Sequence, residues 1–300
     1  MKKLLIQYFL VFKTCLREFN DDKVMKLSAS LSYYTIFSIA PMLMVIISLC
    51  GIFLGEQAVQ GELFEQIRTY VGDEAAIQIQ GMIGSLALNK GSLMASIIGL
   101  ATMLIGATGV FIEIQDSINF MWGIKVKVKK GFLKTLLNRL LAIAIVLGMG
   151  LVLLLSLALN GILIGFASKI QEILPWVPLD LIAISNTVLT LSVLCSLFIV
   201  VFMVLPDAVI RFKDALIGSM FTTLLFMLGK WGIGLYLGFL TVNSTYGAAA
   251  SIIIILLWVY YSAIILYFGA EFTQAYADHI GAGIKPKSYA VLVKKKEFKN

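Results

Sequence analysis

A single lysine, Lys230, interrupts a stretch of apolar residues that covers positions 215–240. It falls fifteen residues into the stretch, or ~22 Å along a helix at about 1.5 Å per residue. At that depth in a bilayer a lysine costs about 2.5–3.5 kcal/mol to insert and usually marks a cavity or pathway. The chemistry it offers is contact with an anionic group, and the alternatives are a structural pair with a carboxylate or a side chain that reaches the membrane surface.

Two asparagines, Asn160 and Asn186, interrupt two further apolar stretches. Counting along the chain places both in the same half of the membrane as Lys230. The three side chains could therefore line one polar pocket and contact a substrate. The alternative is that each asparagine joins two neighbouring helices by a hydrogen bond, which contributes about 0.6 kcal/mol.

Several charged residues fall together at the ends of the apolar stretches: Glu113, Asp116, Asp207, Arg211 and Glu271. One interpretation is a ring of ion pairs that fixes the helix ends. The other is a gate on the cytoplasmic side, in which ion pairs break and reform.

Pro41 follows a run rich in hydroxyl groups, residues 28–38. Proline removes a helical hydrogen bond, and nearby hydroxyls can bind the freed carbonyl groups. The pattern predicts a helix kink at Pro41, which either stays local or lets the helix line a cytoplasm-facing cavity.

The sequence offers little for metal or nucleophilic catalysis. His279 is the one histidine, and the three cysteines are irregularly spaced. A zinc site or a histidine-based triad needs further ligands or partners. A nucleotide-binding Walker pattern is also absent from the sequence. We therefore expect neither metal nor cofactor, and expect any transport to be driven by a gradient or a partner.

The elements that must position these residues are apolar helices. Of the 300 residues, 60% are hydrophobic and 14% are charged, against about 25% charged in a soluble domain. This composition excludes a soluble enzyme and a disordered chain. Six stretches reach the ~20 residues needed to cross a bilayer as a helix: Leu27–Leu54, Ser92–Ile112, Leu140–Ala167, Leu181–Leu205, Ala215–Leu240 and Gly247–Ala270. The predicted fold is an all-α, polytopic integral membrane protein with six transmembrane helices.

Basic residues predict the orientation of these spans. Twenty lysines and arginines lie on one side of the predicted spans, in the segment before the first span and in the segments after the second, fourth and sixth spans. Three lie on the opposite side. The positive-inside rule then places both termini in the cytoplasm, as an even number of spans requires. The net charge of +7 follows from this topology, so no nucleic-acid partner is needed to explain it.

The spans divide the chain into three parts. Residues 1–26 form an amphipathic segment, which we expect to lie on the anionic lipid headgroups of the cytoplasmic face. Residues 27–271 form the transmembrane domain, whose outer loop 55–91 shows the periodicity of short amphipathic surface helices. Residues 272–300 form a basic cytoplasmic tail.

Several motifs, in this order and spacing, carry a family resemblance: Ala29-Ser-Leu-Ser-Tyr-Tyr-Thr-Ile-Phe-Ser-Ile-Ala-Pro41, Asn119-Phe-Met-Trp122-Gly123, Leu205-Pro206-Asp207 with Gly218, Tyr246-Gly247, Leu257-Trp258-Val-Tyr260 and Gly269-Ala270-Glu271. The chain resembles the YihY/BrkB family of bacterial inner-membrane proteins, formerly labelled ribonuclease BN-like, although that family more often has Asn after the proline. The resemblance implies six helices with both ends in the cytoplasm and a build similar to that of transporters.

Metal-dependent cleavage of a phosphodiester needs several carboxylates or histidines clustered in water. The lone His279 and the acids at the membrane edge do not supply them, so we expect no enzymatic activity. We expect a transporter-type protein that moves or flips an anionic or lipid-like substrate. The alternative is a scaffold that does not transport and recruits envelope-associated partners.

Overall fold

The computed structural model describes residues 2–54, 93–127, 180–239 and 249–293, together with the helical residues 61, 64, 65, 68, 76, 77, 79–81, 144 and 148. These residues are mostly helical, which confirms the helical fold class. The predicted third span, Leu140–Ala167, and most of the outer loop 55–91 lie outside the described residues.

The other five predicted spans overlap long helices: α2 (Val24–Leu54), α5 (Leu93–Met121), α7 (Asp180–Val204), α8 (Phe212–Phe239) and α10 (Ala249–His279). Among the described residues, Phe212–Ile233 and Ile253–His279 are long and apolar enough to cross a membrane, and the apolar helix Thr190–Val204 is shorter. α2 continues through Pro41 as one helix. The predicted kink at Pro41 would therefore be a bend within α2, and it stays a prediction.

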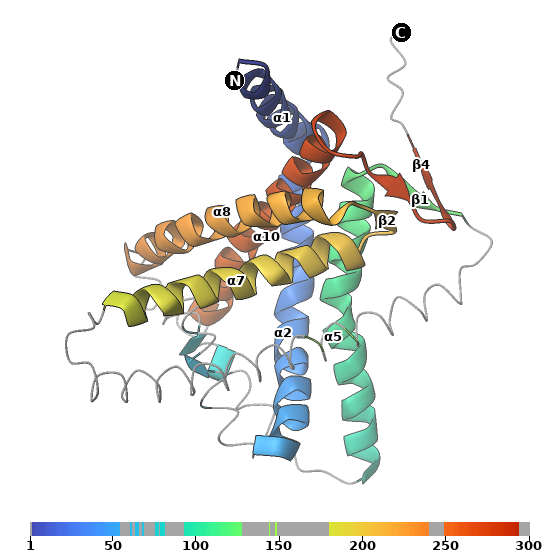
Figure 1. The fold of residues 1–300 in the computed structure, drawn as a ribbon. Coiled ribbons are helices and arrows are strands. Elements are labelled where there is room, and N and C mark those ends of the chain that lie inside the picture. The colour runs from blue at the N-terminus through green and yellow to red at the C-terminus, as the bar shows by residue number, and fades with distance from the viewer. Residues whose placement is uncertain are drawn as a thin grey trace.

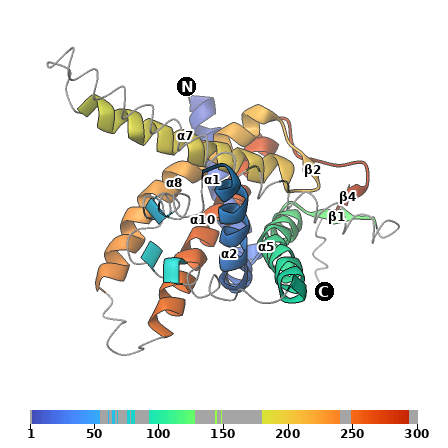
Figure 2. The same ribbon diagram turned by 90° about the horizontal axis from the view of Figure 1, so that it is seen from below.

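The helices meet at one end of the molecule and spread apart at the other. α2 packs beside α5, α7 packs beside α8, and α10 contacts both α2 and α8. The α7–α8 pair crosses the α2–α5 pair and extends away from it (Figures 1 and 2). α2 and α8 begin at the shared end, whereas α5, α7 and α10 finish there.

An amphipathic helix, α1 (Lys2–Asp21), precedes α2. The backbone turns at Asp22 and Lys23, where Lys23 has a φ of 54°. α1 packs on the last part of α10, where Val11 and Cys15 are fully buried against Phe272 and its neighbours.

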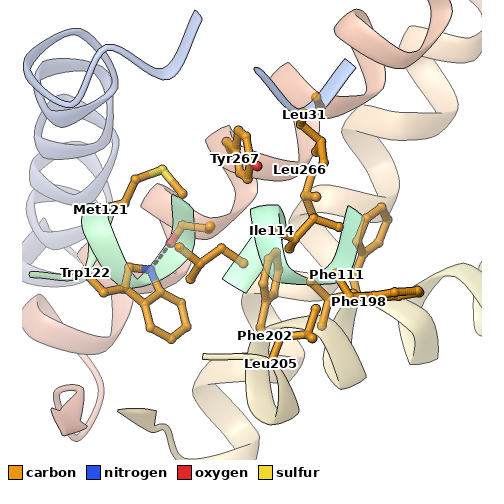
Figure 3. Close-up of a cluster of buried hydrophobic side chains, with 14 of the residues drawn as sticks. Leu31, Phe111, Ile114, Met121, Trp122, Phe198, Phe202, Leu205, Leu266 and Tyr267 are labelled. Carbon is orange, nitrogen blue, oxygen red and sulfur yellow. Dashed lines mark hydrogen bonds between the residues drawn. The ribbon is translucent and has the colours of Figure 1, made fainter. Parts of the chain in front are cut away.

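The largest buried side chains lie where α5, α7 and α10 meet. Trp122, Phe202 and Tyr267 are almost inaccessible to solvent and belong to one apolar cluster with Ile118 and Leu205 (Figure 3). Their burial fixes the shared end of the bundle, because large aromatic side chains remove the most apolar surface from solvent.

Four short strands, which the sequence analysis does not predict, lie at this same end. β1 (Ile124–Val126) pairs with β4 (Ala290–Leu292), and β2 (Ala208–Val209) pairs with β3 (Lys285–Pro286), both antiparallel. In the first pair Ile124 lies opposite Leu292. The segment after α10 therefore returns across the connections that follow α5 and α7.

Candidate functional site

Three of the sequence motifs come together at the strand-bearing end of the bundle. Asn119 and Trp122 lie in and just after the last turn of α5, Asp207 lies after α7, and Ala270 and Glu271 lie on α10. All five residues are buried. Hydrogen bonds join the motifs, from Asn119 to Asp207 and from Trp122 to Ala270.

Asp207 is the centre of a buried hydrogen-bond network. Asn119 donates from Nδ2 to Asp207 Oδ2 at 2.9 Å, and its Oδ1 accepts the Asp207 backbone N–H at 2.8 Å. Gln115 Nε2 donates to Asp207 Oδ1 at 3.4 Å. These uncharged donors bind a carboxyl group that is 1% exposed.

Tyr289, from the segment after α10, completes this network. Its hydroxyl donates to Asp207 Oδ1 at 3.0 Å, and the nearby Lys287 N–H donates to the Asp207 carbonyl at 3.0 Å. Burial, followed by the charge of Asp207, raises the pKa of Tyr289 to about 12. The phenol thus remains a donor at neutral pH.

The turn after α5 forms hydrogen bonds with α10 and with the residue that follows β4. Trp122 Nε1 donates to the Ala270 carbonyl at 3.1 Å (Figure 3). Gly123 adopts a φ of 64° and its carbonyl accepts the Val293 N–H at 2.7 Å. A Cβ at position 123 would meet the Val293 carbonyl oxygen at 2.8 Å, so this close approach requires glycine.

Arg211 pairs with Asp214, a residue that the sequence analysis did not select. Their side chains approach to 3.7 Å, and Asp214 is 1% exposed. Asp214 Oδ2 also accepts the Ala282 N–H at 3.0 Å. On α5, Glu113 is half-buried and Asp116 is exposed.

Glu271 differs from the other acids at this end. It is 0% exposed, and no donor among the described residues forms a hydrogen bond with either carboxyl oxygen. Asp207 is bound by uncharged donors, whereas Asp214 is bound by a cation and a backbone N–H. Asp207, Asp214 and Glu271 are thus buried in three different environments.

The proposed substrate-contact residues lie elsewhere. Lys230 is half-buried on α8, eighteen residues and about 27 Å along the axis from Phe212. Asn186 lies in the first half of α7, and Asn160 falls outside the described residues. Lys230 is thus remote from the Asp207 network.

Sequence reasoning missed Gln115 and Tyr289 as parts of this site and used Asn119 only as a motif residue. Gln115 and Asn119 are four positions apart, which places both on one face of α5 and could have indicated a shared partner. Tyr289 carries no comparable signal, because its contact depends on the chain returning from α10 to the end of α7.

Most of the chain is similar to a family of membrane proteins. A family model described as "Virulence factor BrkB" matches residues 15–291. A UPF0761 membrane protein of Vibrio vulnificus is 25% identical over 263 residues, covering 86% of this chain and 80% of the relative. A UPF0761 membrane protein of Xanthomonas oryzae pv. oryzae is 26% identical over 263 residues, covering 87% of this chain and 59% of the relative. No solved structure matches the chain.

These relatives are named as membrane proteins, and their names state no enzymatic activity. The matched range includes Asn119, Asp207, Glu271 and Tyr289, so it covers the network at the strand-bearing end. The resemblance seen in the sequence motifs is confirmed, and the chain belongs to the BrkB family of bacterial membrane proteins.

Proposed function

We propose that this BrkB-family protein is a transporter-type protein of the bacterial inner membrane. It moves or flips an anionic amphipathic molecule, such as a lipid, and it does not hydrolyse ATP itself. The proposal is carried by one observation, the position of Lys230 on α8. The ammonium group lies far along an apolar helix, where a charge is retained only at a cost.

The surroundings of Lys230 support contact with a lipid-like molecule. Gly229 packs closely on Tyr261 of α10, whereas Leu228 and Trp231 are 70% and 72% exposed. In a membrane such exposed apolar side chains face the lipid chains. Lys230 is therefore placed beside a surface that an amphipathic molecule can reach, with its anionic group drawn to the ammonium.

The topology we propose has six spans and both termini in the cytoplasm. It comprises the amphipathic segment 1–26, the transmembrane domain 27–271 and the basic tail 272–300. Helix directions support it, because α2 and α8 begin at the end where α5, α7 and α10 finish. Exposed basic residues also lie at that end, for example Lys125, Arg211 and Lys285.

Reporter fusions test this topology. A fusion after Asn300 is expected to be cytoplasmic, and an insertion in the loop 61–90 is expected to be external, because of the positive-inside charge bias. Alkaline phosphatase and a fluorescent protein report the two compartments. An external carboxyl terminus would contradict the six-span arrangement.

We also propose that α1 lies on the anionic inner surface of the membrane. Phe9, Phe12 and Leu16 form an exposed apolar stripe on α1, and Lys13 and Arg17 are exposed beside it. An apolar stripe flanked by cations is typical of helices that lie in the membrane interface.

Reconstitution tests the transport proposal. The purified protein is placed in liposomes with fluorescent phosphatidylglycerol, and a membrane-impermeant quencher measures how fast lipid exchanges between leaflets. Exchange above that of protein-free liposomes is expected, and it should exceed the exchange of the zwitterionic phosphatidylcholine analogue. Equal rates with and without protein, for these lipids and for extracts of the source membrane, would count against transport.

A scaffold is the second candidate, and the edge strand β4 favours it. Val291 and Leu292 on β4, and Val293 just after it, are 38%, 47% and 46% exposed. An exposed strand edge with apolar side chains can accept a strand from a partner protein. The scaffold proposal predicts a stoichiometric partner in a pull-down, and predicts that Leu292→Lys loses it.

The tail must be shortened with care in this test. Deleting residues 285–300 would remove β3, β4 and the Tyr289 contact with Asp207, so it would disturb the helix ends as well as any partner. A truncation after Val293 removes four lysines and keeps both strands. If a pull-down finds no partner, or if wild-type function survives both this truncation and Leu292→Lys, the scaffold proposal fails.

A further inference from the structure

Glu271 lies inside the packed interface between α1 and α10. Cys15 on α1 is fully buried and directs its thiol to the Phe268 carbonyl at 3.7 Å. Phe272, one residue after Glu271, belongs to the cluster that buries Val11 and Cys15. α1 thus covers the turn of α10 that carries the carboxyl group.

The polar groups near this turn of α10 lack donors. Among the described residues, no hydrogen-bond partner is found for either Glu271 carboxyl oxygen or for Gln274 Oε1. Glu271 and Gln274 are three positions apart, so they lie on the same face of α10. Buried acceptors without donors are uncommon in native proteins and require an explanation.

The titratable and charged groups around this turn include cations as well as acids, but the charge that acts on Glu271 is that of Glu18. They are Cys15, Arg17 and Glu18 from α1, Glu113 and Asp116 from α5, Arg211 and Asp214 from α8, and Tyr267, Tyr276, Asp278 and His279 from α10 itself. Glu18 acts directly on Glu271, and a negative charge there disfavours a second one. Burial also raises the pKa of Glu18, against the effect of Arg17.

We propose that Glu271 is a proton-binding site of this protein, closed over by α1, whose carboxyl group holds its proton in the packed state. An ionised carboxylate without a donor or a cation is costly to bury. A proton taken from water removes that charge and converts one acceptor oxygen into an O–H donor. Gln274, whose Oε1 also lacks a donor among the described residues, lies three positions farther along α10.

A proton fits this site better than a metal ion. Among the described residues, no three His, Cys, Asp or Glu side chains come together as metal ligands. A proton needs one oxygen, whereas Na⁺ or Ca²⁺ would need several. The proton site stands independently of the transport proposal, and it would supply the protein with a group that responds to pH where α1 meets α10.

Thermal melts in detergent from roughly pH 5 to pH 9 test the proposal through linkage. The folded protein binds a proton that the unfolded chain releases above about pH 4.3, so the stabilising contribution is complete below that pH and is lost as pH rises. The wild-type Tm should therefore fall with rising pH by several degrees more than that of Glu271→Gln. Asp21→Asn, which removes an exposed carboxyl group of α1, should keep the wild-type slope.

Equal slopes in wild type and Glu271→Gln would overturn the proposal. So would a wild-type Tm at high pH that is restored by sodium chloride but not by choline chloride, since that result identifies a cation site. If Glu271→Gln does not fold, infrared spectra of wild-type protein and of the Glu18→Gln variant, both with ¹³C-labelled glutamate, decide the matter. A protonated carboxyl band that persists at neutral pH in the Glu18→Gln variant supports the site, and its absence contradicts it.

Discussion

At the residue scale, Asp207 shows how hydrogen bonds hold a buried carboxyl group at the end of an apolar bundle. Asn119 both donates to the carboxylate and accepts the Asp207 backbone N–H, and Tyr289 adds a phenol donor. Hydrogen bonds to a charged group are stronger than neutral ones, and uncharged donors avoid the cost of burying a second ion. The network therefore ties α5, the turn after α7 and the segment after α10 together through one side chain.

Asn119→Ala is expected to destabilise the protein by about 2–3 kcal/mol, because it leaves a buried charge and a buried N–H with fewer partners. Chemical or thermal unfolding in detergent measures the loss. Asn20→Ala is the control, since Asn20 is exposed on α1, and it should change stability by less than about 0.5 kcal/mol. Equal effects at the two positions would show that the network does not hold this end together.

At the element scale, α8 and α10 cross closely through reciprocal contacts of glycine and threonine. Gly218 of α8 faces Thr273 of α10, and Gly269 of α10 faces Thr222 of α8. Both threonine hydroxyls bond back to the carbonyl of the glycine on their own helix, at 2.7 Å and 2.6 Å. Small residues let helix backbones approach, so van der Waals packing holds the pair in a membrane.

Gly218→Ala is expected to cost about 1–3 kcal/mol, because its new methyl group would overlap Thr273. Gly232→Ala is the matched control on the same helix, since a Cβ at that position meets nothing within 4 Å. It should be neutral or slightly stabilising, as alanine is the better helix former. Unfolding curves of the two variants give the comparison, and similar losses in both would argue against this crossing.

The helices were predictable from sequence because each contains a long apolar stretch, but two of them extend farther than predicted. α5 reaches Met121 and α10 reaches His279, nine residues past the apolar stretches. The added turns carry buried polar side chains, such as Gln115, Asn119 and Glu271. Because these turns contain polar residues, the hydropathy pattern predicts that each span ends before them. Their tertiary contacts keep them helical.

The strands and the Tyr289 contact could not be predicted, for a different reason. β1 pairs residues 124–126 with residues 290–292, and pairing over such a separation leaves no local pattern in either segment. The sequence did indicate that Asp207 and Glu271 belong at one helix end. It could not show that Asp207 is bound by uncharged donors and that Arg211 pairs with Asp214 instead.

At the scale of the whole molecule, the polar network and Lys230 occupy separate places. The network fastens the helices at one end, while Lys230 lies far along α8, which crosses α2 and α5 and leads away from that end (Figure 1). Because α8 is inclined to α2, the distance counted along it is an upper limit on the depth of Lys230. The end of the bundle that the Asp207 network holds together is therefore separate from the part of α8 that carries Lys230, the proposed substrate contact.

The most direct test of the central claim compares lipid exchange by Lys230→Met and Lys213→Met in the same liposomes. Lys213 is exposed at the start of α8, so its loss should leave exchange unchanged. Loss of a charge-assisted contact of about 1.5–3 kcal/mol should slow exchange of anionic lipid by about tenfold or more in Lys230→Met. Lys230→Arg should keep part of the activity, because the charge is kept while its geometry changes. Unchanged exchange in Lys230→Met, or a lowered Tm that is restored by neutralising a carboxylate, would contradict the claim.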